Sequence, residues 1–476
     1  MPKVSFSQDW HQKYLHEIDQ FVENHFPILP SPGSQVQQIQ DFLKSTQTMI
    51  CNEVCRLTPV LKDAGLQVHL MDSYSRHLFT NLELLLNRDL SVNELFCLIM
   101  WEKHVFFSPD SKLKWLNSPM LTGGFERAKQ KLVQLLQNEI SMTLQNILHY
   151  DEEDGHNEDL MDEETFIRVH IDVTQCLNYA ILDAKKVDLM LEVQVLCSGE
   201  LHGFVQKYVD AENEHLKIIT FTEKNSVYLF RIINTCMQLR CCATQISPNT
   251  NKNDINSSTI CMLQELEDNA TSNVRQIMTR LAQANLERHF EKRNGHIDIL
   301  MKEIQRQCAC LPETASEIKV VVVKIAYDSV SKMYLECLMK TKFKKLEKCW
   351  GNAEKKIKED VQYFYKTFSE LNSIAAQQNQ LLLKMIEVLH CSDVDALKIT
   401  CCELFRDFPQ ESEQYVPGLL RWKGVLSERQ VRDVLEVSRE FGLHPSPDVL
   451  EVSREFGLHP TRVTPHPLKR LFCCCC

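Results

Sequence analysis

The sequence predicts an all-α protein, an elongated stack of helical bundles followed by a disordered C-terminal tail. Three observations support this prediction. Apolar residues recur at steps of three and four along most of the chain, which is the period of one face of an α-helix. Glycine is scarce, with 13 in 476 residues, although tight β-hairpins and phosphate-binding loops both need it. The composition, 44% apolar and 25% charged, excludes a collagenous or intrinsically disordered chain.

The N-terminal part predicts five helices. An amphipathic stripe indicates the first helix over residues 9–25. The stripe consists of Trp10, Tyr14, Ile18, Phe21 and Val22. The proline-rich segment 27–33 ends this helix, because proline cannot donate a backbone hydrogen bond. Further helices are expected at residues 35–61, 71–87, 91–107 and 125–149. Ser91 and Glu94 have the spacing of a capping box at the start of a helix.

Two polar segments interrupt the helical pattern. Residues 151–164 include nine acidic residues among 14, and we expect a solvated loop there. A calcium loop is the alternative, but oxygen ligands at alternate positions around a central glycine are not in register. The second segment, 248–254, is a polar linker. Helices are expected at residues 165–186, in several turns up to about 216, and at 222–245 and 260–294.

The strongest periodicity lies between residues 346 and 388. Its apolar positions are Leu346, Trp350, Ala353, Ile357, Val361, Phe364, Phe368, Leu371, Ile374, Leu381, Met385 and Val388. At 1.5 Å per residue, a continuous helix of this length would reach about 60 Å. The spacing therefore predicts long rod helices, with Gly351 as the place for a bend.

These boundaries predict eight segments. They are an N-terminal helix with its proline-rich linker (1–33), a helical bundle (34–150), an acidic loop (151–164), a second bundle (165–247), a polar linker (248–258), long rod helices (259–390), a small C-terminal bundle (391–445), and a tail (446–476).

The tail begins with a repeat. Residues 433–445 recur unchanged as residues 448–460. Two copies cannot build a solenoid, which needs at least three units, so the pattern indicates a duplicated segment. Only the first copy continues a helix, which starts near Ser427, and the second copy is expected in the disordered tail.

No common catalytic signature is present. The patterns GxxxxGK[ST], GxGxxG, HExxH and GxSxG do not occur. The 20 cysteines include no pair at two-residue spacing outside the terminal run, which disfavours zinc and favours reduced thiols. Cys197 and His202 are the only nucleophile and base that we single out, and chance proximity explains them better. We therefore expect no enzyme, no cofactor and no metal site, and the net charge of −11 disfavours nucleic acid.

Two features are candidates for binding. The first is a lysine-rich segment, in which a basic helix face could contact an anionic membrane or an acidic partner; a merely solvated face is the alternative. The candidate patch is Lys340, Lys344, Lys345, Lys348, Lys355 and Lys356, with Lys342 and Lys358 beside it. The second feature is the end of the sequence, whose candidate lipidation sites are Cys473, Cys474, Cys475 and Cys476. Its alternative is a terminus that arose with the duplication.

The C-terminal third carries a resemblance. An apolar helix (385–389) precedes Ser392-Asp393-Val394-Asp395-Ala396-Leu397-Lys398-Ile399, then Phe405-Arg406-Asp407-Phe408-Pro409, then Leu419-Leu420-Arg421-Trp422-Lys423-Gly424-Val425-Leu426-Ser427. This order resembles the exocyst component three family, and within it the branch of tumour necrosis factor alpha-induced protein 2 (M-Sec). In the last string, Gly424 suits a left-handed helix end, and Ser427 with Gln430 forms a second capping box.

The resemblance implies a helical rod that tethers vesicles without catalysis. Its implied partners are exocyst subunits, SNARE proteins and Ral-type small GTPases, and its implied place is the cytoplasm, peripheral at the plasma membrane. The alternative that it implies is an adaptor for actin-dependent membrane protrusion, independent of the exocyst. Two departures from the family are the weakly basic N-terminus, with only Lys3 and Lys13 in the first 25 residues, and the cysteine-rich end.

Overall fold

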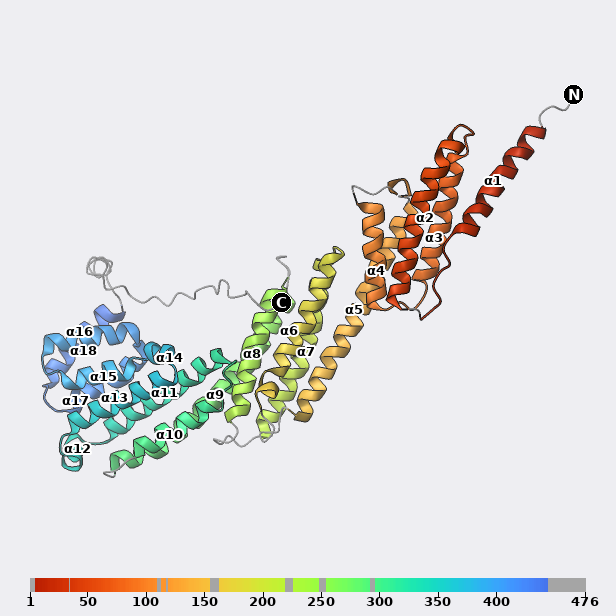
Figure 1. Ribbon diagram of the computed structural model, residues 1–476. Coiled ribbons are helices and arrows are strands. Elements are labelled where there is room, and N and C mark those ends of the chain that lie inside the picture. The colour runs from red at the N-terminus through yellow and green to blue at the C-terminus, as the bar shows by residue number, and fades with distance from the viewer. Residues whose placement is uncertain are drawn as a thin grey trace. The chain divides into compact units, whose positions relative to one another are not determined.

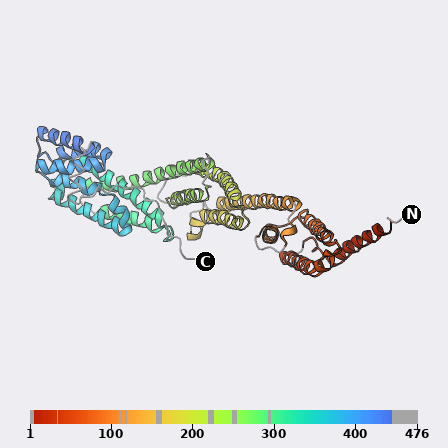
Figure 2. The same ribbon diagram turned by 90° about the horizontal axis from the view of Figure 1, so that it is seen from above.

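The computed structural model describes residues 5–33, 35–108, 113–116, 119–154, 162–218, 226–247, 254–291 and 296–443. Within these ranges every regular element is a helix and no strand occurs (Figure 1 and Figure 2). The all-α prediction is therefore confirmed. The tail 446–476, including the second copy of the repeat and the terminal cysteines, lies outside the described residues.

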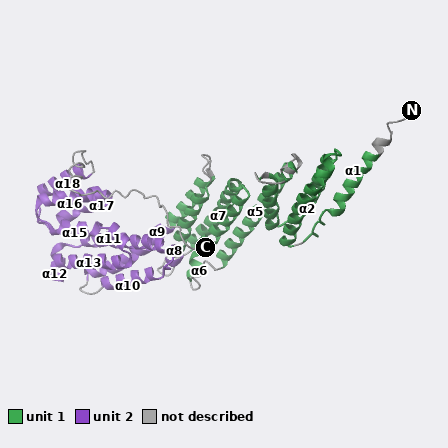
Figure 3. Ribbon diagram, turned by 45° about the horizontal axis from the view of Figure 1, so that its top comes forward, with its two compact units in different colours: residues 1–219, 231–269 green, residues 220–230, 270–476 purple. Residues whose placement is uncertain are grey.

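The chain divides into two compact units, residues 1–219 with 231–269 and residues 220–230 with 270–476 (Figure 3). Helices α8 and α9 each contribute to both. The first part of the chain contains α1 (Ser5–His25), α2 (Val36–Lys62), α3 (Gln67–Leu86), α4 (Val92–Glu102), a π-helix (Lys103–Phe107), a 3-10 turn (Lys114–Leu116), α5 (Pro119–Asp154), α6 (Glu163–Lys186), α7 (Met190–Ile218), α8 (Ser226–Ile246) and α9 (Asp254–Glu291). The rest contains α10 (His296–Ala309), α11 (Ser316–Lys340), α12 (Phe343–Trp350), α13 (Ala353–Leu371), α14 (Ser373–Gln378), α15 (Leu381–His390), α16 (Val394–Asp407), α17 (Pro409–Trp422) and α18 (Glu428–Leu443).

In the first unit, α5 joins two groups of helices. It packs against α3 and α4, and against α6 and α7 further along (Figure 1). With 36 residues it is about 54 Å long. The capping box predicted at the start of α4 is confirmed, because the Glu94 N–H donates to Ser91 Oγ at 3.3 Å and the Ser91 N–H donates to Glu94 Oε2 at 2.7 Å.

The acidic segment differs from the expected solvated loop at both of its described ends. Residues 151–154 complete α5, and Glu163 begins α6; residues 155–161 lie outside the described ranges. Asp151 is buried and, like Glu212 of α7, accepts a hydrogen bond from the fully buried guanidinium of Arg231 on α8. A charge in the interior is tolerated only when it is paired, so this cluster fixes α5, α7 and α8 to one another. The expected linker at 248–258 likewise ends early, since α9 begins at Asp254.

In the second unit, α11 is the central helix. Residues on all its sides are buried, and it contacts α10, α13, α14, α15 and α17. The apolar run from Val320 to Val323 lies in this helix. A helix that is buried on all sides carries apolar residues all round instead of along one face.

The stretch 346–388 is four helices instead of one rod. Gly351 adopts φ of 78° and ends α12, a conformation that glycine adopts without steric cost. Asn352 and Asn372 then cap α13 and α14 with their side-chain oxygens, which satisfies backbone N–H groups that a helix start leaves unpaired. A third break follows α14. Because of these breaks, α13 packs against α15, which a single straight helix does not permit.

Candidate functional site

The lysine-rich segment folds around α12, a helix of eight residues. Lys342, before its start, is extended, and Gly351 closes its end. The Ala353 N–H donates to Glu347 Oε2 at 3.0 Å across the turn that follows. These contacts fix the direction of α12 relative to α13.

One side of α12 is apolar and anchored at both ends. Leu346 is fully buried. At the N-terminal end, the ring of Phe343 contacts the edge of Trp422 on α17, with ring centroids 5.2 Å apart. The indole N–H of Trp422 donates to the carbonyl of Thr341 at 2.7 Å. At the other end, Trp350 lies against Phe290 of α9, with ring centroids 5.3 Å apart.

A buried polar network supports that second anchor. Asp360 of α13 is 3% exposed, and its Oδ2 lies 2.9 Å from His289 Nε2 and accepts from Tyr334 Oη at 3.1 Å. The His289 ring also packs on Trp350, with centroids 5.3 Å apart. Burial and the adjacent Asp360 carboxylate raise the pKa of Tyr334. The network joins α9, α11 and α13 beneath α12.

The other side of α12 is basic. Lys342, Lys344, Lys345 and Lys348 are all exposed, and we call these four the basic surface. None of their ammonium groups has an acidic oxygen within 4 Å among the described residues. A binding partner could therefore pair with these four ammonium groups without first breaking an ion pair to one of the described residues.

The structure separates the other predicted lysines from this surface. Lys340 belongs to α11, and its Nζ lies 3.7 Å from Glu336 Oε2. Because the chain leaves the helical conformation between α11 and α12, Lys340 does not share one basic helix face with the lysines of α12, and the predicted patch is wrong in this respect. On α13, Lys355 lies 3.8 Å from Glu359, and Lys356 lies 2.9 Å from the buried Asp360 carboxylate.

The string from Leu419 to Ser427 holds the basic helix in place. Besides the Trp422 contact with Thr341, Lys423 pairs with Glu354 at 2.7 Å, so the string reaches the chain on both sides of α12. The predicted left-handed Gly424 is confirmed with φ of 69°. The predicted Ser427 cap is also confirmed, because Ser427 Oγ accepts from the N–H of Gln430 at 3.4 Å.

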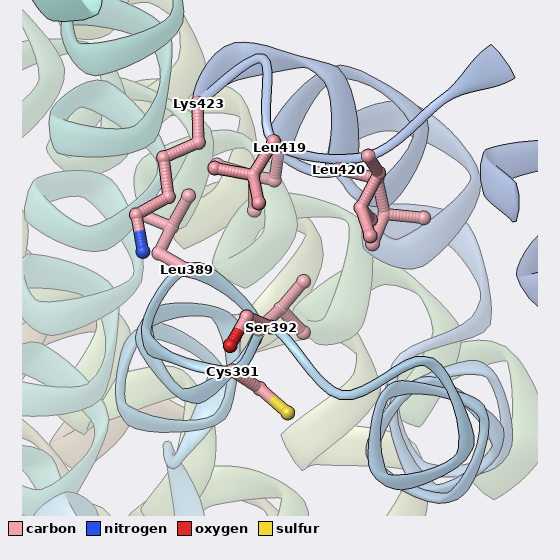
Figure 4. A pocket seen from close by; sticks show the side chains of 9 residues that line it. Leu389, Cys391, Ser392, Leu419, Leu420 and Lys423 are labelled. Atoms are coloured by element: carbon pink, nitrogen blue, oxygen red, sulfur yellow. The ribbon is translucent and has the colours of Figure 1, made fainter.

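A small cavity lies against the same string (Figure 4). Leu389, Cys391 and Ser392 line one side, and Leu419, Leu420 and Lys423 line the other. Its volume of about 10 Å³ is that of a site for one water molecule. It is a packing gap between α15 and α17 and cannot hold a substrate.

Cys197 and His202 do not form a nucleophile–base pair. Both lie within the continuous helix α7. Cys197 is buried, and burial raises the pKa of its thiol to about 12. His202 Nδ1 instead lies 2.9 Å from Thr259 Oγ1 on α9. A thiol with this pKa is almost wholly protonated at neutral pH, and only the thiolate is nucleophilic.

The described residues include neither a metal-binding cluster nor a membrane-spanning helix. No cluster of three or more metal-ligating side chains occurs among them. None of the helices described combines the length and the apolar character that crossing a bilayer requires.

Sequence reasoning missed the anchors of α12. Trp422 and Trp350 were assigned to the family-like string and to an apolar seam, and neither pattern reveals the partner ring. Asp360 did carry a usable signal. It shares the buried face of α13 with Ile357, Val361 and Phe364, and an acid among apolar positions indicates a buried polar partner.

Fold and surface together define a class of protein. Over the described residues, the chain is an assembly of packed helices with an exposed basic surface. The chain belongs to the family of exocyst complex component Sec6, whose profile matches residues 9–428.

Curated relatives agree with that assignment. The chain is 21% identical to the human exocyst complex component 3-like protein over 491 residues, which cover 94% of this chain and 64% of the relative. The mouse protein of the same name is 21% identical over 485 residues, covering 92% and 64%. The chain thus spans less than two thirds of the length of these relatives. Among solved structures, the crystal structure of M-Sec matches 91% of this chain and 79% of its own, with a TM-score of 0.65 and 14% identity, which shows a shared fold.

Proposed function

We propose that this chain is a non-enzymatic tethering or scaffold protein of exocytosis, which acts in the cytoplasm and peripherally at the plasma membrane. Its family, that of an exocyst complex component, supports this proposal, and so do two relatives named exocyst complex component 3-like. The proposed partners are other exocyst subunits, SNARE proteins and Ral-type GTPases.

The observation that carries the proposal is the basic surface. Its lysines are exposed and have no acidic oxygen within 4 Å in the part of the chain that the structure describes. The helix α12, which carries three of them, is anchored at both ends by Trp422 and Trp350. A rigid cluster of one charge sign speeds the association of an oppositely charged partner and rejects a like-charged one. Because the net charge of the chain is −11, this local patch differs in sign from the overall field.

The test is a pulldown from cytosol with a charge-reversed variant. Lys344→Glu, Lys345→Glu and Lys348→Glu together should lower the recovery of exocyst subunits, SNAREs or Ral GTPases about tenfold or more, since each reversal replaces an attraction by a repulsion. The matched control reverses Lys186, Lys217 and Lys366, which are exposed lysines already beside a carboxylate. Both variants have the same net charge, so equal recovery from the two would contradict a role for the basic surface.

A second candidate is an adaptor for actin-dependent membrane protrusion that works without the exocyst. In that case the basic surface binds anionic lipid directly, because a lysine near an anionic leaflet contributes about 1 kcal/mol. Co-sedimentation with phosphatidylserine vesicles, compared with phosphatidylcholine vesicles, distinguishes the two. Lipid binding that the triple reversal abolishes, together with a pulldown that recovers no exocyst subunit, favours the adaptor.

A further inference from the structure

Helix α18 closes the second unit through an extensive contact with α16. Its buried side consists of Val431, Val434, Leu435, Ser438 and Gly442. Deep burial of two valines and a leucine makes this contact the main stabilisation of α18. We call the surface that receives it the α18 site.

A close approach of backbones fixes the register of α18 in its site. A Cβ atom on residue 442 would lie 2.6 Å from Phe405 Cβ and 2.9 Å from the carbonyl oxygen of Cys402. Real Cβ atoms do not come so close, and the Cys402 carbonyl belongs to the α16 backbone, so position 442 accepts only glycine.

Two ion pairs add to the specificity of the site. Asp433 lies 2.7 Å from Lys398 Nζ of α16. Arg439 donates from two nitrogens to the two carboxylate oxygens of Glu413 on α17, at 2.9 and 2.6 Å. A bidentate pair of this kind recognises one side-chain shape at one place.

All but one of these contacts belong to the first copy of the repeat, and the second copy supplies the same side chains in the same spacing. The equivalent residues are Asp448 for Asp433, Val449 for Val434, Leu450 for Leu435, Ser453 for Ser438, Arg454 for Arg439 and Gly457 for Gly442. The glycine that the close approach requires and the two residues that form the ion pairs are thus each present twice in the sequence.

We propose that residues 448–460 are an alternative occupant of the α18 site, so that the last helix of this fold exists in two registers 15 residues apart. The first copy is favoured, because its N-terminal turn adds buried Val431 and the Ser427 cap. The second copy has Ser446 where the first has Val431. Pro447 comes directly before the second copy, and proline is compatible with the first turn of a helix.

The connection does not prevent the exchange. From Trp422, the last residue of α17, the chain reaches Asp433 across 10 residues or Asp448 across 25. The entropy of closing a loop grows only with the logarithm of its length, so the longer connection costs little more. In the second register, residues 427–445 leave the packed core, so a binding partner of that segment would shift the chain to this register.

The test uses the full chain and paired substitutions. Val434→Asp introduces a charge into the buried face of the first copy, and Val449→Asp is the matched change in the second. Hydrogen exchange of α16, residues 394–407, reports whether the α18 site is filled, and light scattering reports mass. We expect Val449→Asp alone to leave the hydrogen exchange of α16 unchanged. We expect the Val434→Asp chain to retain the protection of α16 as a monomer, and the double variant to lose that protection.

A disulfide trap identifies the occupant directly. Cys402 Sγ lies 3.9 Å from the Val437 carbonyl, so a cysteine at 437, or at its equivalent 452, comes within reach of Cys402. In the Val434→Asp chain, Val452→Cys should cross-link to Cys402 about tenfold more than it does in the chain with Val434 intact, as a shift between two registers requires. Protection lost equally in the single Val434→Asp and the double variant overturns the proposal. Protection retained only in a dimer also overturns it, since the occupant then comes from a second chain.

Discussion

Glu102 provides a sharp test of how the first unit is packed. It is 2% exposed at the end of α4, and its Oε2 has no hydrogen-bond partner among the described residues. Burial, together with the nearby Glu83 carboxylate, raises the pKa of Glu102 from 4.5 to about 8. The folded chain therefore keeps this side chain protonated at neutral pH.

The sign and size of the effect follow from this pKa. The folded chain binds the proton more tightly than the unfolded chain, so the free energy of unfolding falls as pH rises from about 4.5 to about 8 and is level above that range. At about 1.4 kcal/mol per pKa unit, the loss amounts to about 3 kcal/mol at pH 7. Glu102→Gln removes the titrating group at nearly constant shape and should remove this pH dependence.

The assay is hydrogen exchange in α4 and urea unfolding at pH 5, 7 and 9. The variant should gain about 4 kcal/mol relative to the original chain between pH 5 and pH 9, because the original chain is destabilised over about three pKa units in that range. Glu126→Gln is the control, since Glu126 is 58% exposed. If the free energy of unfolding changed with pH in the same way for Glu102→Gln and for the original chain, the inference that Glu102 is buried and protonated would be wrong.

Further predictions concern other parts of the chain. Burial lowers the pKa of His170 on α6 from 6.5 to about 4, so the free energy of unfolding should fall as pH drops from 6.5 to about 4, and His170→Gln should abolish this fall in acid titrations. Trp422→Ala removes the hydrogen bond to Thr341 and the contact with Phe343, and should destabilise the second unit by about 2 kcal/mol with faster exchange in α12. Small-angle scattering of the whole chain should give an elongated particle, and a rounded one would contradict the predicted stack of bundles. Palmitate labelling in cells should disappear when Cys473 to Cys476 are replaced by serine, and a chain that is never labelled would exclude a palmitate anchor there.

Some features of the fold were predictable because their causes are local. The period of apolar residues specifies helices, and the Ser91 and Ser427 caps act within four residues of a helix start. Gly424 was recognised from its position between two helical patterns. The family could be inferred from the string around it, where Trp422 and Lys423 now have an evident role in holding α12.

The candidate site was predictable only in part. The sequence shows a cluster of lysines and, four residues from Lys340, Lys355 and Lys356, the acidic residues that pair with them within one helix. It does not show that the lysines of the basic surface stay exposed once the helices pack. The break between α11 and α12 removed Lys340 from the expected face. The spacing of apolar residues alone does not reveal such a break, because the residues after the break still pack into the core at intervals of three and four.

The sequence by itself determined that the chain is helical, where several helices start and end, and which family it resembles. Only the tertiary structure decided that the stretch 346–388 breaks into packed helices, that Asp151 and Glu102 are buried, and that the lysines of the basic surface are exposed with no acidic oxygen within 4 Å among the described residues. The physical reason is the distance along the sequence over which each interaction acts. Helix period, capping and ion pairs within one helix depend on residues within a few positions, whereas burial depends on side chains that are distant in the sequence and meet only when the helices pack.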